Sequence, residues 1–150
     1  MRLLFLVLIL FSQRSHSQEI ASLKFDVEKY TLENGMTVLL HQDSTSPIVS
    51  YHTWFRVGSK GEEVGYTGIA HLFEHMMFKG TSKVGGDDFS RINARFGGSN
   101  NAFTTDDYTG YYQLYPSHRL GLALELEADR MQNLVLKPED FDKEIQRSEE

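Results

Sequence analysis

The feature that most constrains this chain is the segment His71-Leu72-Phe73-Glu74-His75. Apolar residues in and around the segment repeat at the spacing of an α-helix, and Gly80 lies where a C-terminal cap belongs. We therefore expect an amphipathic helix of about three turns. The side chains expected to face the core are Leu72, Phe73 and Met76.

The two histidines of this segment lie one helical turn apart. Side chains at i and i+4 share a face, so His71 and His75 can bind a single metal ion. Glu74 falls beside that ion, where its carboxylate can take a proton from a metal-bound water. The sequence contains no cysteine, so every metal ligand is nitrogen or oxygen. The pattern predicts a Zn²⁺ site with His71 and His75 as ligands and Glu74 as general base.

Strand and helix patterns follow one another without strict alternation. Asn34-Gly35, between two β-prone segments, predicts a hairpin. The apolar and β-branched segment 48–57 is typical of a central strand. This order favours an α+β fold, a largely antiparallel sheet with helices packed on it. The remaining expected strands are 100–105 and 108–114, and the expected helices are 87–96, 117–133 with Leu120, Leu124 and Met131 toward the core, and one that begins at Pro138.

The first 17 residues are typical of an export signal. Arg2 precedes the nine apolar residues Leu3–Phe11, and Ser15 and Ser17 have the spacing of a cleavage site. Nine residues are far fewer than the roughly 20 that a membrane-spanning helix needs. We expect no stable membrane span and an exported protein, periplasmic or secreted, whose mature chain begins near residue 18.

The last helix pattern has no stop signal. It begins at Pro138 and still shows an apolar pair, Phe141 and Ile145, close to Glu150. We therefore interpret residues 18–150 as the N-terminal part of a longer metallopeptidase domain, a fragment.

The charge balance limits the class of partner. The chain has 15 basic and 21 acidic residues, a formal charge of −6, and no basic run. A surface of this kind does not favour nucleic acid, whose phosphates are bound by clustered lysine and arginine. We expect no nucleic-acid partner.

The motif also supports a family resemblance. His-x-x-Glu-His is the inverted zinc motif of the inverzincins. The surrounding residues resemble the pitrilysin, insulin-degrading enzyme and mitochondrial processing peptidase family, and are similar to its bacterial processing-peptidase-like members. The segments that carry the resemblance are Leu32–Met36, Val57–Ser59, Gly68–Thr81 and Asn101–Thr104, together with Tyr108.

The resemblance implies a zinc metalloendopeptidase, a hydrolase with His71 and His75 as zinc ligands and Glu74 as general base. It also implies that Asn101 and Ala102 lie on an edge strand that binds substrate. An edge strand suits this role because its unpaired backbone groups can hydrogen-bond an extended peptide.

In the family, the third zinc ligand is a glutamate that follows another functionally important glutamate by seven residues. Glu144 resembles that earlier, supporting glutamate, which puts the ligand at position 151. Seven residues turn through roughly 700° and return to the same helix face, whereas Glu150 lies about 120° from Glu144. Two alternatives remain: the ligand follows Glu150, or a local deletion makes Glu150 the ligand.

The family resemblance also implies partners. They are a peptide or small-protein substrate and a homologous C-terminal half or partner subunit, so we expect the 150-residue stretch alone to bind zinc weakly and to cleave peptides poorly. The first rival is a non-catalytic paralogue or partner subunit of the same fold. A second, S-ribosylhomocysteinase, is disfavoured by the missing cysteine and the expected export signal. A third is a structural zinc-binding module.

Overall fold

The computed structural model describes residues 24–149, which fall into two compact units, 24–43 and 44–149. The expected export signal and Glu150 lie outside the described residues. Among the described residues, no helix combines the length and the apolar character needed to cross a membrane.

The first unit is a hairpin of two antiparallel strands, β1 (Glu28–Thr31) and β2 (Thr37–Leu40). Gly35 has a φ of +85°, a left-handed conformation that glycine adopts at no steric cost. The backbone N–H of Met36 donates to Oδ1 of Asn34 at 3.0 Å. The hairpin predicted from Asn34-Gly35 is confirmed.

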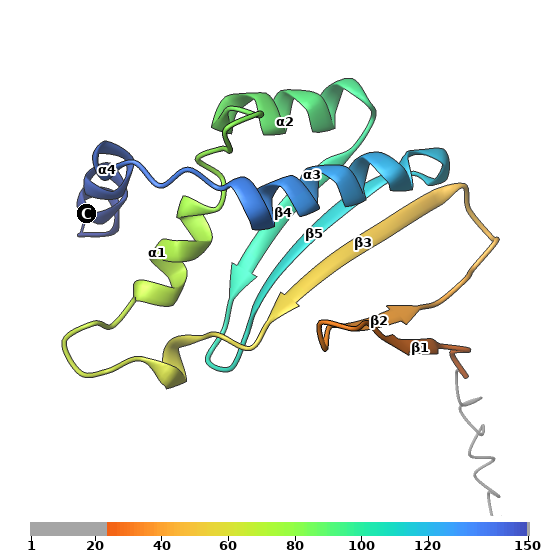
Figure 1. Cartoon of the computed structure of the whole chain (residues 1–150), viewed down its shortest axis with the longest axis horizontal. Helices are drawn as coiled ribbons and strands as arrows, with labels where there is room; N and C mark the ends of the chain where they lie inside the picture. Colours follow the sequence, from red (N-terminus) through yellow and green to blue (C-terminus); the bar gives the residue numbers. More distant parts are fainter. Residues whose placement is uncertain (1–23, 150) are drawn as a thin grey trace, which may run out of the picture. The chain divides into compact units, whose positions relative to one another are not determined.

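The second unit contains a three-stranded antiparallel sheet (Figure 1). Its strands are β3 (Ile48–Phe55), β4 (Ser99–Thr104) and β5 (Thr109–Pro116), in the order β3-β5-β4. The prediction that segment 48–57 forms a central strand is therefore wrong, because β5 is central. The short turn between β4 and β5 places these two strands side by side, and β3 pairs with the other side of β5.

Helices pack on one face of this sheet. They are α1 (Ile69–Met76), α2 (Gly86–Arg95) and α3 (Leu120–Asn133), while α4 (Pro138–Glu149) packs against α1 (Figure 1). Two short 3₁₀ turns, Ser59–Gly61 and Ser117–Arg119, precede α1 and α3. The predicted α+β class, with helices on a largely antiparallel sheet, is confirmed.

The helix α3 is buried on a face that differs from the expected one. Its buried residues are Ala123, Leu126, Glu127 and Arg130. The residues predicted to face the core, Leu120, Leu124 and Met131, are 38, 47 and 49% exposed. The prediction fails because Arg130 pairs with Glu127 and lies 4.5 Å from the ring centre of Tyr111, which makes a charged pair tolerable in the core.

The helix α1 is also shorter than expected. It has eight residues, about two turns, and the chain leaves the helix at Met77. Met76 is 1% exposed, as expected, but Phe73 is 46% exposed and does not face the core. Gly80 forms an antiparallel bridge with Gly85 rather than a helix cap.

Candidate metal centre

The start of α1 is held by a side chain from the preceding loop. Gly68, at the N-cap, has a φ of +91° and offers no side chain to the free backbone N–H groups. Glu62 takes that role, since its two carboxylate oxygens accept from the N–H groups of Gly68 and Ala70, each at 2.8 Å. Its negative charge also suits the positive end of the helix. The backbone that carries His71 is thereby fixed.

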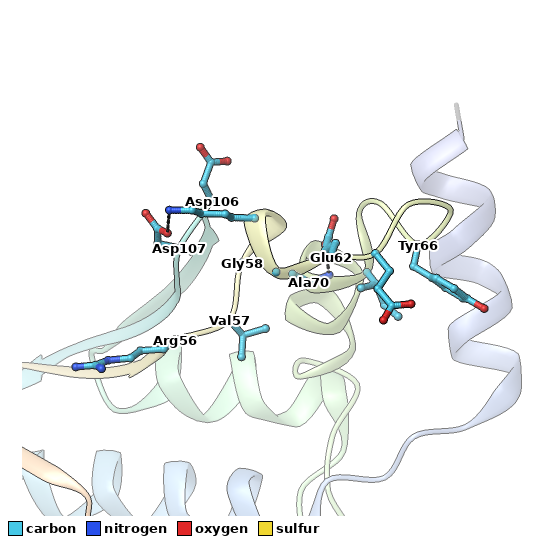
Figure 2. A pocket seen from close by; sticks show the side chains of 12 residues that line it. Arg56, Val57, Gly58, Glu62, Tyr66, Ala70, Asp106 and Asp107 are labelled. Carbon is cyan, nitrogen blue, oxygen red and sulfur yellow. Dashed lines mark hydrogen bonds and ion pairs between the residues drawn. The ribbon is translucent and has the colours of Figure 1, made fainter.

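A cavity of about 600 Å³ opens beside this helix start (Figure 2). Its lining includes Glu62 and Ala70, and its rim carries the ion pair of Lys60 with Asp107 at 3.3 Å. Neither His71 nor Glu74 lines it. The cavity therefore flanks the helix that carries the histidines without containing their side chains.

The two histidines converge on the exposed side of α1. The Nε2 atoms of His71 and His75 are 3.1 Å apart. Nδ1 of His75 lies 2.7 Å from Oε2 of Glu144, and since a carboxylate only accepts, that nitrogen carries the proton. In the neutral form of His75, the lone pair of Nε2 then points toward His71. A carboxylate that fixes the tautomer of a histidine in this way is the usual companion of a metal-binding imidazole.

Glu144 reaches His75 from α4, 69 positions later in the chain. It is buried, and its other oxygen accepts from Nζ of Lys79 at 2.5 Å. The hydrogen bonds from Lys79 and His75, together with the nearby positive charges, lower the pKa of Glu144 to about 2. Glu144 is therefore ionised at neutral pH.

The donor set fits zinc. Two nitrogen ligands of a tetrahedral zinc, at about 2.0–2.1 Å from the metal, lie about 3.3 Å apart. The Nε2 atoms of His71 and His75 have close to this separation. Within the described residues, no cluster of three histidine, aspartate or glutamate side chains could hold a metal ion. The described chain thus offers two histidine nitrogens at the spacing of zinc ligands and a carboxylate hydrogen-bonded to one of the two rings.

Glu74 is turned to the sheet side of α1. Its carboxylate is buried, and Oε2 accepts from the hydroxyl of Thr104 at 2.5 Å. Among the described residues, Oε1 has no hydrogen-bond partner. The side chain of Glu74 therefore has one oxygen held by the sheet and one oxygen without a hydrogen-bond partner among the described residues.

Asn101 and Ala102 lie on β4, an edge strand of the sheet in the described unit. This strand packs against α1. The backbone N–H of Ala102 donates to the side-chain Oδ1 of Asn101 at 2.9 Å, a local contact within the strand. The structure thus puts the two residues expected to bind substrate on the strand next to the histidine helix.

The sequence predicts three residues that the structure brings to one place: His71, His75 and Glu144. Glu74, on the same helix, is hydrogen-bonded on the sheet side by Thr104. The sequence alone does not reveal Glu62, Lys79 or Thr104. Lys79 and Thr104 belong to segments that carry the family resemblance, but their roles depend on contacts with residues 65 and 30 positions away. A local pattern carries no signal for such contacts.

The fold and this site define a class: an α+β domain in which the helix that carries the paired histidines lies beside an edge strand. A family model described as Insulinase (Peptidase family M16) matches residues 37–150, and the chain belongs to this family. The expected resemblance to the pitrilysin and processing peptidase family is confirmed.

Several named proteins are similar in sequence to this chain. The chain is 36% identical over 115 residues to a protein named zinc protease PqqE of Helicobacter pylori, an alignment that covers 76% of this chain and 26% of that protein. It is 36% identical to an uncharacterized zinc protease, YmxG, of Bacillus subtilis, covering 69% of this chain and 25% of that one. It is also 34% identical to subunit 1 of the bovine mitochondrial cytochrome b-c1 complex, covering 75% and 23%.

A solved structure supports the fold. The crystal structure of a protease from Helicobacter pylori superposes with a TM-score of 0.78 at 36% identity, covering 82% of this chain and 30% of that one. The chain spans about a quarter of the length of the curated relatives that it matches.

Proposed function

We propose that the protein is a zinc-dependent metallopeptidase that hydrolyses peptide bonds. The observation that carries this proposal is the convergence of the His71 and His75 Nε2 atoms, 3.1 Å apart, with Glu144 orienting His75. The names of relatives that contain the words zinc protease support it. Glu74, one residue before His75, is the general base.

The residues of the site have separate tasks. Zinc, when bound, lowers the pKa of a coordinated water toward neutrality and polarises the carbonyl under attack. Glu74 accepts the proton of the attacking water on its free oxygen, Oε1, and then delivers a proton to the leaving amine. Glu144 keeps the ring of His75 in the tautomer that leaves Nε2 unprotonated. No covalent acyl-enzyme forms, since the nucleophile is water.

The substrate binds as an extended strand along β4. Its backbone pairs with the groups near Asn101 and Ala102, which gives affinity with little dependence on side chains. Because β4 packs against α1, a peptide on this edge runs next to Glu74. This arrangement accounts for cleavage of peptides and small proteins, with an endopeptidase as the proposed type.

Two parts of the proposed enzyme come from beyond the described residues. A third zinc ligand completes the site, either Glu150 or the residue after it, since catalytic zinc sites use three protein ligands. A homologous second half or partner subunit closes around the peptide. The apolar segment Leu3–Phe11 supports a location outside the cytoplasm.

The second candidate is a non-catalytic subunit of the same fold. It is favoured by the similarity to subunit 1 of the bovine cytochrome b-c1 complex, whose name describes a component of an assembly. The paired histidines and Glu74 favour the peptidase over this alternative, because a scaffold has no need of them.

The test compares the full-length protein with its Glu74→Gln variant. Zinc content and cleavage of a quenched-fluorescent peptide library are measured for both, with Glu125→Gln on the exposed side of α3 as the matched control. We expect all three to hold one zinc and only Glu74→Gln to lose cleavage, by at least about 100-fold. Cleavage that survives Glu74→Gln, or a folded protein without zinc, contradicts the peptidase and favours the subunit.

A further inference from the structure

The carboxylate of Glu74 is held from the sheet by a single hydroxyl. Thr104, the last residue of β4, donates its Oγ1 proton to Oε2 of Glu74 at 2.5 Å. The two residues are 30 positions apart in the chain. Glu74 is 8% exposed, and no other described residue hydrogen-bonds its carboxylate. Thr104 is therefore the one described contact that fixes the orientation of this carboxylate.

Thr104 is itself held firmly. It is paired with Thr109 across the β4–β5 ladder, and the two hydroxyl oxygens are 3.3 Å apart. The next residue, Thr105, closes the turn into β5, since its N–H and its hydroxyl both donate to the carbonyl of Tyr108 at 2.9 Å. A β-branched side chain at such a position has little rotameric freedom.

The neighbouring hydroxyl decides where the proton of Thr104 goes. Thr109 is 4% exposed and donates its own hydroxyl proton to the carbonyl of Val57 at 2.9 Å. A hydroxyl has one proton, so Thr109 has none left for Thr104. Thr104 is therefore free to donate to Glu74, and its hydroxyl is aimed by the sheet at Oε2.

The same strand carries the residues proposed to bind substrate. Asn101 and Ala102 precede Thr104 by three and two positions on β4. The strand β4 therefore positions both reacting partners: the peptide pairs with its edge, and the carboxylate of Glu74 is hydrogen-bonded to its last residue. The distance between the free oxygen of Glu74 and the bound peptide is then set by the strand rather than by the flexible glutamate side chain.

We propose that Thr104 is a positioning residue for Glu74. Its hydroxyl holds the carboxylate of the general base in a fixed position relative to the substrate strand. This inference rests on the proposed peptidase function. Removing the hydroxyl leaves the carboxylate free to rotate away from the attacking water, so the rate of the chemical step falls while substrate binding is retained.

The experiment measures kcat and KM of the full-length protein on one quenched-fluorescent peptide, together with zinc content and melting temperature. The variants are Thr104→Val, Thr104→Ala and Thr104→Ser. Thr53→Val is the matched control, because Thr53 is a partly buried threonine of the same sheet whose hydroxyl bonds to Tyr51. Glu74→Gln is measured in the same assay.

We expect kcat to fall about 10–100-fold in Thr104→Val and Thr104→Ala, with KM within about twofold and one zinc retained. Thr104→Ser keeps the hydroxyl and should stay within about threefold of the wild type. Thr53→Val should be unchanged. Thr104→Ala adds no atom, so it provides the test even if the valine variant does not fold.

Three outcomes overturn the inference. A kcat within twofold of the wild type in Thr104→Ala shows that the hydroxyl is not needed. A loss in Thr104→Ser equal to that in Thr104→Ala shows that the methyl group matters instead. A parallel loss of zinc or of melting temperature in Thr104→Ala makes the residue structural.

The proposed function fails separately. If the wild type does not cleave peptide, or Glu74→Gln cleaves as well as the wild type, then the peptidase proposal is wrong and the role of Thr104 falls with it. If Glu74→Gln is inactive and Thr104→Ala is fully active, only the role of Thr104 is wrong.

Discussion

At the scale of single residues, Glu144 has the most hydrogen-bond and ion-pair partners in the candidate metal centre. It pairs with Nδ1 of His75, with Lys79 at 2.5 Å and with Arg147 at 3.8 Å. Glu144 is nearly fully buried, so its charge depends on these partners. The carboxylate of Glu144 thus holds the imidazole of His75, and Lys79 and Arg147 in turn stabilise the charge of that carboxylate.

Replacing Glu144 by glutamine should weaken zinc binding. The amide can still occupy the space, but it no longer fixes the tautomer of His75 by charge. We expect the zinc dissociation constant of the full-length protein to rise about 10–100-fold, measured by competition with a chromogenic chelator. Glu139→Gln on the exposed face of α4 is the control and should leave the affinity unchanged. An equal affinity in both variants would contradict an orienting role.

The residues of the site differ in how far the sequence alone could place them. The i, i+4 spacing of His71 and His75 is local geometry, so their convergence could be predicted directly. Glu144 could be named only through the family resemblance, because no local rule connects α4 to α1. Thr104 and Glu62 act through contacts that depend on how loop, helix and sheet pack, and they could not be predicted at all.

At the scale of elements, the connection from α1 to α2 is the most constrained backbone. Gly80 has a φ of +105°, and a Cβ there would lie 2.5 Å from the backbone nitrogen of Gly86. By contrast, a Cβ on Gly121 in α3 would have no atom within 4 Å. The two glycines can therefore be compared directly: the surroundings of Gly80 leave no room for a side chain, whereas those of Gly121 do.

Gly80→Ala should destabilise the fold by about 2–5 kcal/mol, from backbone strain and crowding together. Gly121→Ala should stabilise α3 by up to about 1 kcal/mol, because alanine is the better helix former. Urea unfolding of residues 24–150, followed by far-ultraviolet circular dichroism, measures both. Equal unfolding midpoints for the two variants would show that the connection adapts to a side chain at position 80.

The same connection is tied to α3 by Asp129. The hydroxyl of Thr81 donates to its carboxylate and is the main cause that lowers the pKa of Asp129, with Asn133 and Lys83 adding to the effect. A carboxyl whose folded pKa lies below its unfolded value, about 3.9, stabilises the fold above that pH. The contribution is lost as the pH falls through the folded pKa.

Asp129→Asn should therefore lower the free energy of unfolding by about 1–3 kcal/mol at pH 7. The difference from the wild type should shrink as the pH falls below about 4. Urea titrations at pH 7 and pH 3 measure it, with the exposed Asp142→Asn as control. A difference that is the same at both pH values would mean that the carboxylate charge plays no part.

The elements themselves were predictable where their signals are local. The turn residues Asn34-Gly35 predict a hairpin, and the structure has it. The buried face of α3 was not predictable, because Arg130 and Glu127 become acceptable core residues only when they meet each other and the ring of Tyr111. The central place of β5 likewise depends on strand pairing, which the apolar content of segment 48–57 does not reveal.

At the scale of the whole molecule, the described residues supply only part of the proposed zinc site. His71 and His75 of α1 and Glu144 of α4 come together, and no cluster of three side chains able to hold a metal ion lies among the described residues. The chain also spans about a quarter of the length of its curated relatives. Tight zinc binding and cleavage are therefore expected of the full-length protein.

The last prediction separates the two alternatives for the third ligand. A carboxylate that orients a metal ligand without touching the metal raises metal affinity about 10–100-fold. The loss of a direct ligand should therefore lower zinc affinity by at least about 100-fold. If the ligand follows Glu150, residues 24–150 should bind zinc at least about 100-fold more weakly than the full-length protein, and Glu150→Gln should leave the full-length affinity unchanged. His71→Ala should abolish the remaining affinity in both. Equal affinities for the two lengths, lost together in Glu150→Gln, would identify Glu150 as the ligand and show that α4 carries a local deletion.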